Sequence, residues 1–209
     1  MADIPKVAVS DSVTSKDTEI PQLSKPFLGQ PVEICIVTPT LQTTLSGLVR
    51  LGIGPFKIFH FSPSTVSEQT IRGQAAPFEL QVAFAEQGKM IWEVMCPISG
   101  QTIMQEFLDR TGGVGGIHHV AFDCADGDCA SAGAPRNGEV ARAEARRRRR
   151  EVERRGFSLA QSGVWHGKQG TCEFMFFDTE GAVNTCFESY VFSDDWEEPD
   201  AVEVFPAGV

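Results

Sequence analysis

An internal repeat constrains the fold more than any other feature of the sequence, because one order of predicted elements occurs twice. Hydrophobic periodicity predicts a strand, a helix and three further strands in each copy. The first copy comprises 31–41, 42–56, 57–63, 78–87 and 89–97, and the second comprises 117–124, 140–157, 158–165, 172–179 and 184–192. A further helix at 100–110 and the glycine-rich segment TGGVGG connect the copies. This β-α-β-β-β order predicts an α+β domain of two related modules.

The domain limits follow from the repeat. Module 1 is expected over about 28–113 and module 2 over about 114–192, with a surface loop at about 124–139 that has no counterpart in module 1. Residues 1–27 are expected to form a flexible arm, because they lack a sustained apolar pattern. Residues 193–209 form an acidic tail that we expect to be extended, with Trp196 and Phe205 packed on the body.

Composition excludes several classes of function. The formal net charge of −10 argues against nucleic acid as the main partner, and no apolar run approaches the length of a membrane span. The run ARAEARRRRREVERR is predicted to be a solvated helix face whose arginines pair with glutamates one turn away. The first residues lack the apolar block of a signal peptide, so we expect a cytoplasmic protein with its six cysteines reduced.

Four ionisable residues fall in register between the two copies. Glu33 and His119 occupy equivalent places in the first strands, and Glu93 and Glu188 occupy equivalent places in the last strands. A carboxylate among apolar strand residues is expensive to bury unless it is paired or bound to a metal. The register therefore predicts that the inward faces of the two modules bring these four side chains together.

The segment GIHHVAFD contains two adjacent histidines, His118 and His119. Neighbouring side chains in a regular strand point to opposite faces, so the two rings cannot serve one site equally. Regular alternation places one of them with Ala121 and Asp123 and the other with Val120 and Phe122. The pattern alone leaves open which of the two histidines belongs to a functional site.

The segments VEICIVTPTL, MIWEVMCP, GIHHVAFD and TCFESY resemble the vicinal-oxygen-chelate superfamily, over about residues 30–192. The resemblance is to its branch of glyoxalase I and methylmalonyl-CoA epimerase. It implies two paired βαβββ modules that form a cupped mixed β-sheet around one cleft. It also implies one divalent metal ion (Zn, Mn, Fe, Co, Ni or Mg), a small-molecule substrate and a possible homodimer. The implied ligands are Glu33, Glu93, His119 and Glu188, with His118 as a packing residue or an outer hydrogen-bond partner.

One position departs from the pattern of this branch, in which the place of Glu33 is commonly His or Gln. Three carboxylates and a neutral imidazole around a divalent ion give a net charge of −1, which puts either the ligation or the ionisation of Glu33 in doubt. A carboxylate held only loosely by the metal can instead act as a base.

The chemistry implied is that of an isomerase, epimerase or lyase that abstracts a proton beside a metal-bound carbonyl. Glu188 is the first candidate for the base and Glu33 the second. His60, His166 and Lys168 are expected in the walls of the substrate pocket. Two alternatives remain open: a rearrangement, cyclisation or ring opening in a natural-product pathway, and a metal-free small-molecule-binding protein of the resistance type. An extradiol dioxygenase is disfavoured, because its Fe(II) needs two histidines and only one is in register.

Overall fold

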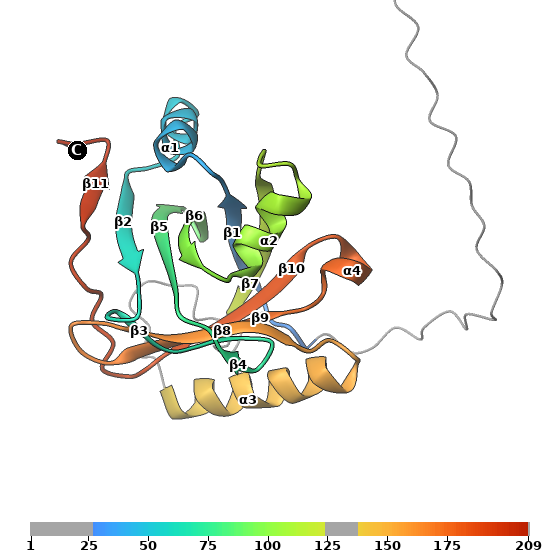
Figure 1. The fold of residues 1–209 in the computed structure, drawn as a ribbon. Helices are drawn as coiled ribbons and strands as arrows, with labels where there is room; N and C mark the ends of the chain where they lie inside the picture. The colour runs from blue at the N-terminus through green and yellow to red at the C-terminus, as the bar shows by residue number, and fades with distance from the viewer. Residues whose placement is uncertain (1–26, 124–137, 209) are drawn as a thin grey trace, which may run out of the picture.

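The computed structural model describes residues 27–123 and 138–208 (Figure 1). Most of the expected N-terminal arm and almost all of the expected loop at 124–139, with Cys124 and Cys129, lie outside the described residues. The described helices and strands are, in chain order, β1 (Pro31–Val37), α1 (Leu41–Arg50), β2 (Phe56–Phe61), β3 (Val66–Ile71), β4 (Gln74–Ala75), β5 (Phe78–Gln87), β6 (Met90–Gly100), α2 (Ile103–Arg110), β7 (Gly116–Asp123), α3 (Gly138–Arg154), β8 (Leu159–His166), β9 (Thr171–Phe177), α4 (Glu180–Val183), β10 (Cys186–Phe192) and β11 (Glu203–Phe205).

The strands form one curled mixed sheet in the order β11-β2-β5-β6-β1-β7-β10-β9-β8-β3-β4. The first module contributes β2-β5-β6-β1 and the second contributes β7-β10-β9-β8. Read outward from the β1–β7 junction, both modules have their first strand innermost, followed by their last, third and second strands. In both modules the first strand runs parallel to the last, and the modules join through antiparallel pairing of β1 with β7. This confirms the predicted fold of two paired modules in one cupped sheet (Figure 1).

The hairpin of β3 and β4 was not predicted from the sequence. Although β3 follows β2 in the chain, it pairs with β8 of the second module, opposite Trp165 and Gln161. The buried side chain of Gln69 ties β3 back to the first module, because its amide donates to Phe78 O at 3.0 Å and its Oε1 accepts from Phe78 N at 3.2 Å. The hairpin thus connects the two ends of the cup.

The concave side of the sheet is filled with apolar side chains from both modules. Phe59 and Phe61 of the first module pack on Trp165 of the second, with ring centroids 5.1 Å and 4.9 Å apart. Helix α2 contributes Met104 and Leu108 to the same core. The two modules therefore share one hydrophobic interior.

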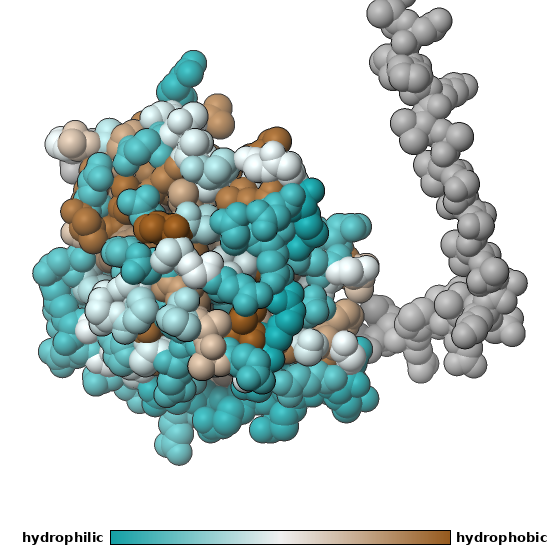
Figure 2. All heavy atoms as spheres, viewed as in Figure 1, coloured by the Kyte–Doolittle hydropathy of each residue, from teal (hydrophilic) through white to brown (hydrophobic). Residues whose placement is uncertain are grey.

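Helices α1 and α3 cover the convex sides of the first and second module (Figure 1). In α1 the buried residues Leu41, Leu45 and Leu48 recur at helical spacing and pack against β2, β5 and β6. On α3 the arginines pair with glutamates one turn away, as predicted: Arg147 with Glu144, Arg149 with Glu153, and Arg154 with Glu151. Figure 2 shows the resulting hydrophilic surface around α3, whereas hydrophobic residues gather in the upper half of this face.

The C-terminal tail packs on the body through its two large aromatic side chains, as expected. The Trp196 ring lies 5.0 Å from both Trp165 and Phe192, between ring centroids. Phe205 belongs to β11, which pairs with the outer strand β2. Within the described residues, no helix combines the length and apolar character that crossing a membrane requires.

Candidate metal centre

Four adjacent central strands, β6, β1, β7 and β10, carry the four residues that the repeat aligned. Glu93 and His119 both neighbour Cys35 of β1, on its two sides. Glu33 and Glu188 both neighbour Ala121 of β7. Because the side chain of Ala121 ends at its Cβ, it leaves room for the two longer carboxylates to meet over it. The four side chains lie on the concave face, where Cys35 joins the shared core.

The structure brings all four predicted residues into one buried cluster. His119 Nε2 lies 2.9 Å from Glu93 Oε2 and 3.2 Å from Glu188 Oε2. One potential ligand atom from each of Glu33, Glu93, His119 and Glu188 lies within 4.8 Å of the others. No residue of this cluster is more than 4% exposed. Metal binding by these four residues stays a prediction, and the close spacing of their potential ligand atoms is compatible with it.

Burial and mutual repulsion set the protonation of the cluster. Burial, followed by repulsion from Glu93 and Glu188, raises the pKa of Glu33 well above its usual value. Burial likewise raises the pKa of Glu188 to about 7, against the opposing effect of His119. For His119, burial disfavours the charged imidazolium, but the adjacent carboxylates of Glu188 and Glu93 outweigh this effect and raise the pKa to about 9. Without a cation, this interior retains protons at neutral pH.

The donor set fits a divalent ion. Glu188 Oε2 is buried and has no hydrogen-bond partner among the described residues, because the nearby His119 Nε2 is directed to Glu93. Ligand atoms about 2.1 Å from a common ion lie roughly 3 to 4 Å from one another, which is compatible with this spacing. Oxygen and imidazole donors suit Zn, Mn, Fe, Co, Ni or Mg, and they do not choose among these ions.

Cys35 is a fifth candidate donor that the sequence analysis did not assign. Its sulfur forms a second close group with Glu93 and His119. Burial, followed by Glu93, raises the pKa of this thiol well above its usual value. The signal was present in the sequence, since Cys35 stands two residues after Glu33 and therefore on the same face of the strand.

Residues 33–176 match the model of the Glyoxalase/Bleomycin resistance protein/Dioxygenase superfamily, which is more than half of the chain. The chain belongs to this superfamily. The resemblance to vicinal-oxygen-chelate proteins is thereby confirmed. None of the curated proteins compared with the chain matches it.

Solved structures of similar fold include a variant of Streptomyces coelicolor methylmalonyl-CoA epimerase in complex with 2-nitronate-propionyl-CoA. It has a TM-score of 0.50 and 15% identity, and the match covers 78% of this chain and 96% of the epimerase. Methylmalonyl-CoA epimerase from Mycobacterium tuberculosis has a TM-score of 0.47, 15% identity, and coverage of 85% and 93%. A hypothetical protein from Bacillus halodurans C-125 has a TM-score of 0.46, 17% identity, and coverage of 83% and 98%. At such identities the likeness concerns the fold alone.

The prediction that His118 and His119 point to opposite faces of the strand is wrong. Cys35 pairs with His119 and the next residue, Ile36, pairs with Ile117, so His118 is an extra residue in β7. Such a β-bulge changes the direction of the side chains around it. The His118 ring consequently meets the His119 ring, at 2.8 Å between the two Nδ1 atoms, instead of lying with Val120 on the other face.

The three residues predicted for the pocket wall lie apart from the cluster. His60 is half-exposed on β2, with Nε2 3.6 Å from Glu79 Oε2. His166 Nε2 lies 2.8 Å from Ser67 Oγ, and Lys168 forms a 2.6 Å ion pair with Asp200 in the tail. The structure does not group them with the four acidic and imidazole side chains, and their contact with a substrate remains a prediction.

The four side chains of the cluster are buried by the described residues. A surface cavity of about 420 Å³ exists, but its lining includes none of the four: it is formed by Pro39, Pro97, Gln105, Leu108, Asp109, Gly112 and Gly113. Helix α2 lies beside the cluster, where Phe107 contacts His118 at 5.0 Å between ring centroids.

Proposed function

We propose that this protein is a divalent-metal-dependent isomerase, epimerase or lyase that moves a proton beside a carbonyl group of a small oxygenated substrate. One observation carries the proposal: three carboxylates and one imidazole from both modules converge in a buried interior. A cluster with that excess of carboxylates is costly to bury without a cation. Membership of a superfamily that includes glyoxalases and dioxygenases supports a catalytic role for the cluster.

Glu93 and His119 are the residues best placed to hold the ion, because Glu93 Oε2 and His119 Nε2 already face each other at 2.9 Å. A divalent ion bound there supplies a Lewis acid that polarises a substrate carbonyl. Glu188 is proposed as the base, since its Oε2 has no hydrogen-bond donor among the described residues. Its pKa of about 7 suits proton transfer near neutral pH.

Glu33 complements Glu188 as a proton donor. The carboxyl groups of Glu33 and Glu188 lie in the same buried cluster, and burial raises the pKa of Glu33 well above its usual value. The raised pKa favours the protonated form of Glu33, which suits a proton donor beside Glu188. A base and an acid on neighbouring carboxyl groups are what an epimerisation or isomerisation requires.

The test measures metal content first and proton exchange second. The full chain is purified without chelator, and its metals are measured before and after adding Zn²⁺, Mn²⁺, Co²⁺, Ni²⁺ or Mg²⁺. The loaded protein is then incubated in D₂O with methylmalonyl-CoA and with dihydroxyacetone, which carry a C–H bond beside a carbonyl. We expect about one ion per chain and deuterium uptake into one probe.

The matched variants separate binding from proton transfer. Glu188→Gln is expected to retain the ion and to slow exchange by roughly 10²- to 10⁴-fold. Arg149→Gln, altered in an exposed ion pair on α3, serves as the control and should exchange like the unaltered chain. Metal binding with equal exchange in both variants would remove Glu188 as the base.

A second candidate function is metal-free binding of a small molecule. It is supported by the pairing of His119 with Glu93, which compensates part of the buried charge internally. A chain that takes up less than a tenth of an equivalent of every ion offered would support this candidate against the first. Turnover in which a carbon-bound label beside the carbonyl stays in place would instead favour the rearrangement alternative.

A further inference from the structure

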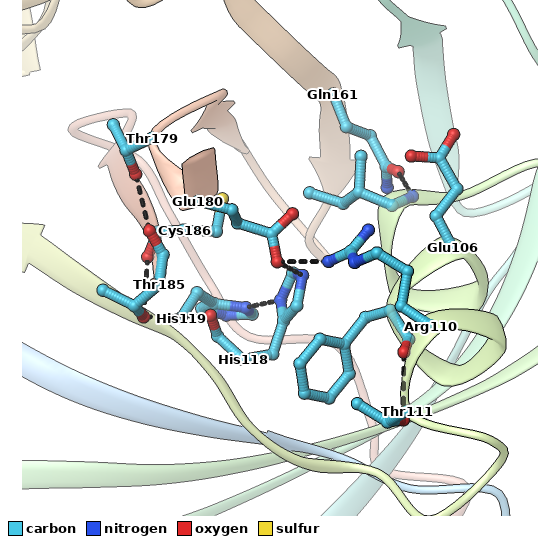
Figure 3. A network of polar contacts seen from close by, with 12 residues as sticks. Glu106, Arg110, Thr111, His118, His119, Gln161, Thr179, Glu180, Thr185 and Cys186 are labelled. Atoms are coloured by element: carbon cyan, nitrogen blue, oxygen red, sulfur yellow. Dashed lines mark hydrogen bonds and ion pairs between the residues drawn. The ribbon is translucent and has the colours of Figure 1, made fainter. Parts of the chain in front are cut away.

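The imidazoles of His118 and His119 form a buried N···N hydrogen bond, with 2.8 Å between their Nδ1 atoms (Figure 3). The two rings are nearly perpendicular, at 84°, and neither residue is more than 1% exposed. Such a bond needs one nitrogen that donates and one that accepts. The tautomer of one ring therefore dictates the tautomer of the other.

The direction of this bond follows from the other nitrogen of His119. Its Nε2 faces Glu93 and Glu188, where a metal ion would need a free lone pair. A neutral imidazole that offers Nε2 to a metal carries its proton on Nδ1. His119 Nδ1–H then donates to His118 Nδ1, and His118 in turn carries its own proton on Nε2.

The surroundings of His118 fit this arrangement. Its Nε2 is buried without a hydrogen-bond partner among the described residues, and the nearest carboxylate oxygen is Glu180 Oε1 at 3.6 Å. Arg110 Nη2 holds the same oxygen at 2.6 Å, which fixes Glu180 in front of the ring. Phe107 packs edge-on against the imidazole. Thr185 Oγ1 donates to the carbonyl oxygen of His118 at 3.0 Å.

We propose that His118 is a positioning residue, which with Glu180 holds His119 in the orientation and tautomer that present Nε2 to a divalent ion. This inference rests on the proposed metal-dependent function. It adds to that function two residues, His118 and Glu180, that support a ligand without contacting the ion. Outer hydrogen-bond partners commonly fix a ligating histidine, through a carboxylate or a carbonyl, and raise its basicity as a ligand. Here a second histidine, placed by the β-bulge, stands between the ligand and the carboxylate.

The first experiment needs no variant. Ring ¹⁵N resonances of the Zn²⁺-loaded full chain report which nitrogen of each histidine is protonated. We expect His119 with its proton on Nδ1 and His118 with its proton on Nε2. Either histidine in the opposite tautomer would overturn the proposal, even if Zn²⁺ binds.

The second experiment measures Co²⁺ affinity by competition with a chelator. His118→Leu removes the acceptor and is expected to weaken Co²⁺ binding by roughly 10- to 100-fold. His118→Gln, whose amide oxygen can accept from His119 Nδ1–H, is expected to recover most of that loss. Glu180→Gln should fall between the two, and Arg149→Gln, altered in an exposed ion pair on α3, should bind like the unaltered chain.

The outcomes distinguish the two proposals. Tight Co²⁺ binding by the unaltered chain together with equal binding by His118→Leu overturns the positioning role alone. Failure of the unaltered chain to bind Zn²⁺ and Co²⁺ overturns the metal-dependent function and the positioning role with it. If His118→Leu does not fold, the ¹⁵N measurement on the unaltered chain and the His118→Gln affinity still decide the question.

Discussion

Glu93 and His119 face each other across the junction between the two modules, with His119 Nε2 2.9 Å from Glu93 Oε2. Glu93 belongs to the last strand of the first module and His119 to the first strand of the second. In the metal-free protein, the proton on Nε2 occupies the position that the proposed ion would take. Metal binding and protonation therefore compete for the same nitrogen.

Metal binding is predicted to release about one proton at pH 7. The pKa of His119 is raised to about 9, so its ring retains a proton that the ion must displace. Apparent affinity should consequently rise as the pH increases from 6 to about 9. Titration calorimetry with Zn²⁺ in two buffers of different ionisation enthalpy counts the protons. A count of zero would contradict the proposed ligand set.

The metal-free protein is predicted to lose stability as the pH rises above neutrality. His119 has a folded-state pKa of about 9 against an ordinary value of 6.5, so its stabilising contribution is complete below 6.5 and disappears as the pH passes 9. Glu188 acts in the same direction, because its pKa rises from 4.5 to about 7. The folded chain binds more protons than the unfolded chain over this range, and Tm should fall. Thermal melts from pH 6 to 9 check this, with a rising Tm as the contrary result.

The ligands are predicted to differ in their importance for Co²⁺ binding. His119→Ala and Glu93→Ala should each weaken affinity by more than roughly 100-fold, beyond the usual effect of losing an outer hydrogen-bond partner. Glu33→Gln should retain the ion, because burial favours the neutral form of the Glu33 carboxyl and an amide is neutral as well. Competition titrations of the three variants make the comparison. A loss for Glu33→Gln as large as that for Glu93→Ala would show that the charge of Glu33 is essential.

Gln69→Leu is predicted to lower the free energy of unfolding by about 1 to 3 kcal/mol, because it leaves buried backbone groups of Phe78 without partners. Gln74→Leu is the matched control, since Gln74 is exposed on the short edge strand β4. Urea denaturation of both variants measures the difference. Equal midpoints would mean that Gln69 does not hold β3 to the first module.

Much of this architecture is readable in the sequence. The order of apolar strands and amphipathic helices repeats, and strand periodicity is a local property that neighbouring residues determine. Equivalent positions in the two copies are enough to single out Glu33, Glu93, His119 and Glu188, because a repeat that folds twice in the same way places equivalent residues alike. The buried cluster of these four side chains follows from that register.

The tertiary structure alone decided the environment of the cluster. The bulge at His118 arises from the register between β7 and β1, a pairing of distant segments that alternation within one strand cannot show. The crossing of β3 to β8 likewise depends on which sheet edge lies nearest in space. Enclosure by α2 results from packing between elements far apart in the chain. The sequence therefore determined which residues face inward, whereas non-local pairing and packing determined what each of them meets there.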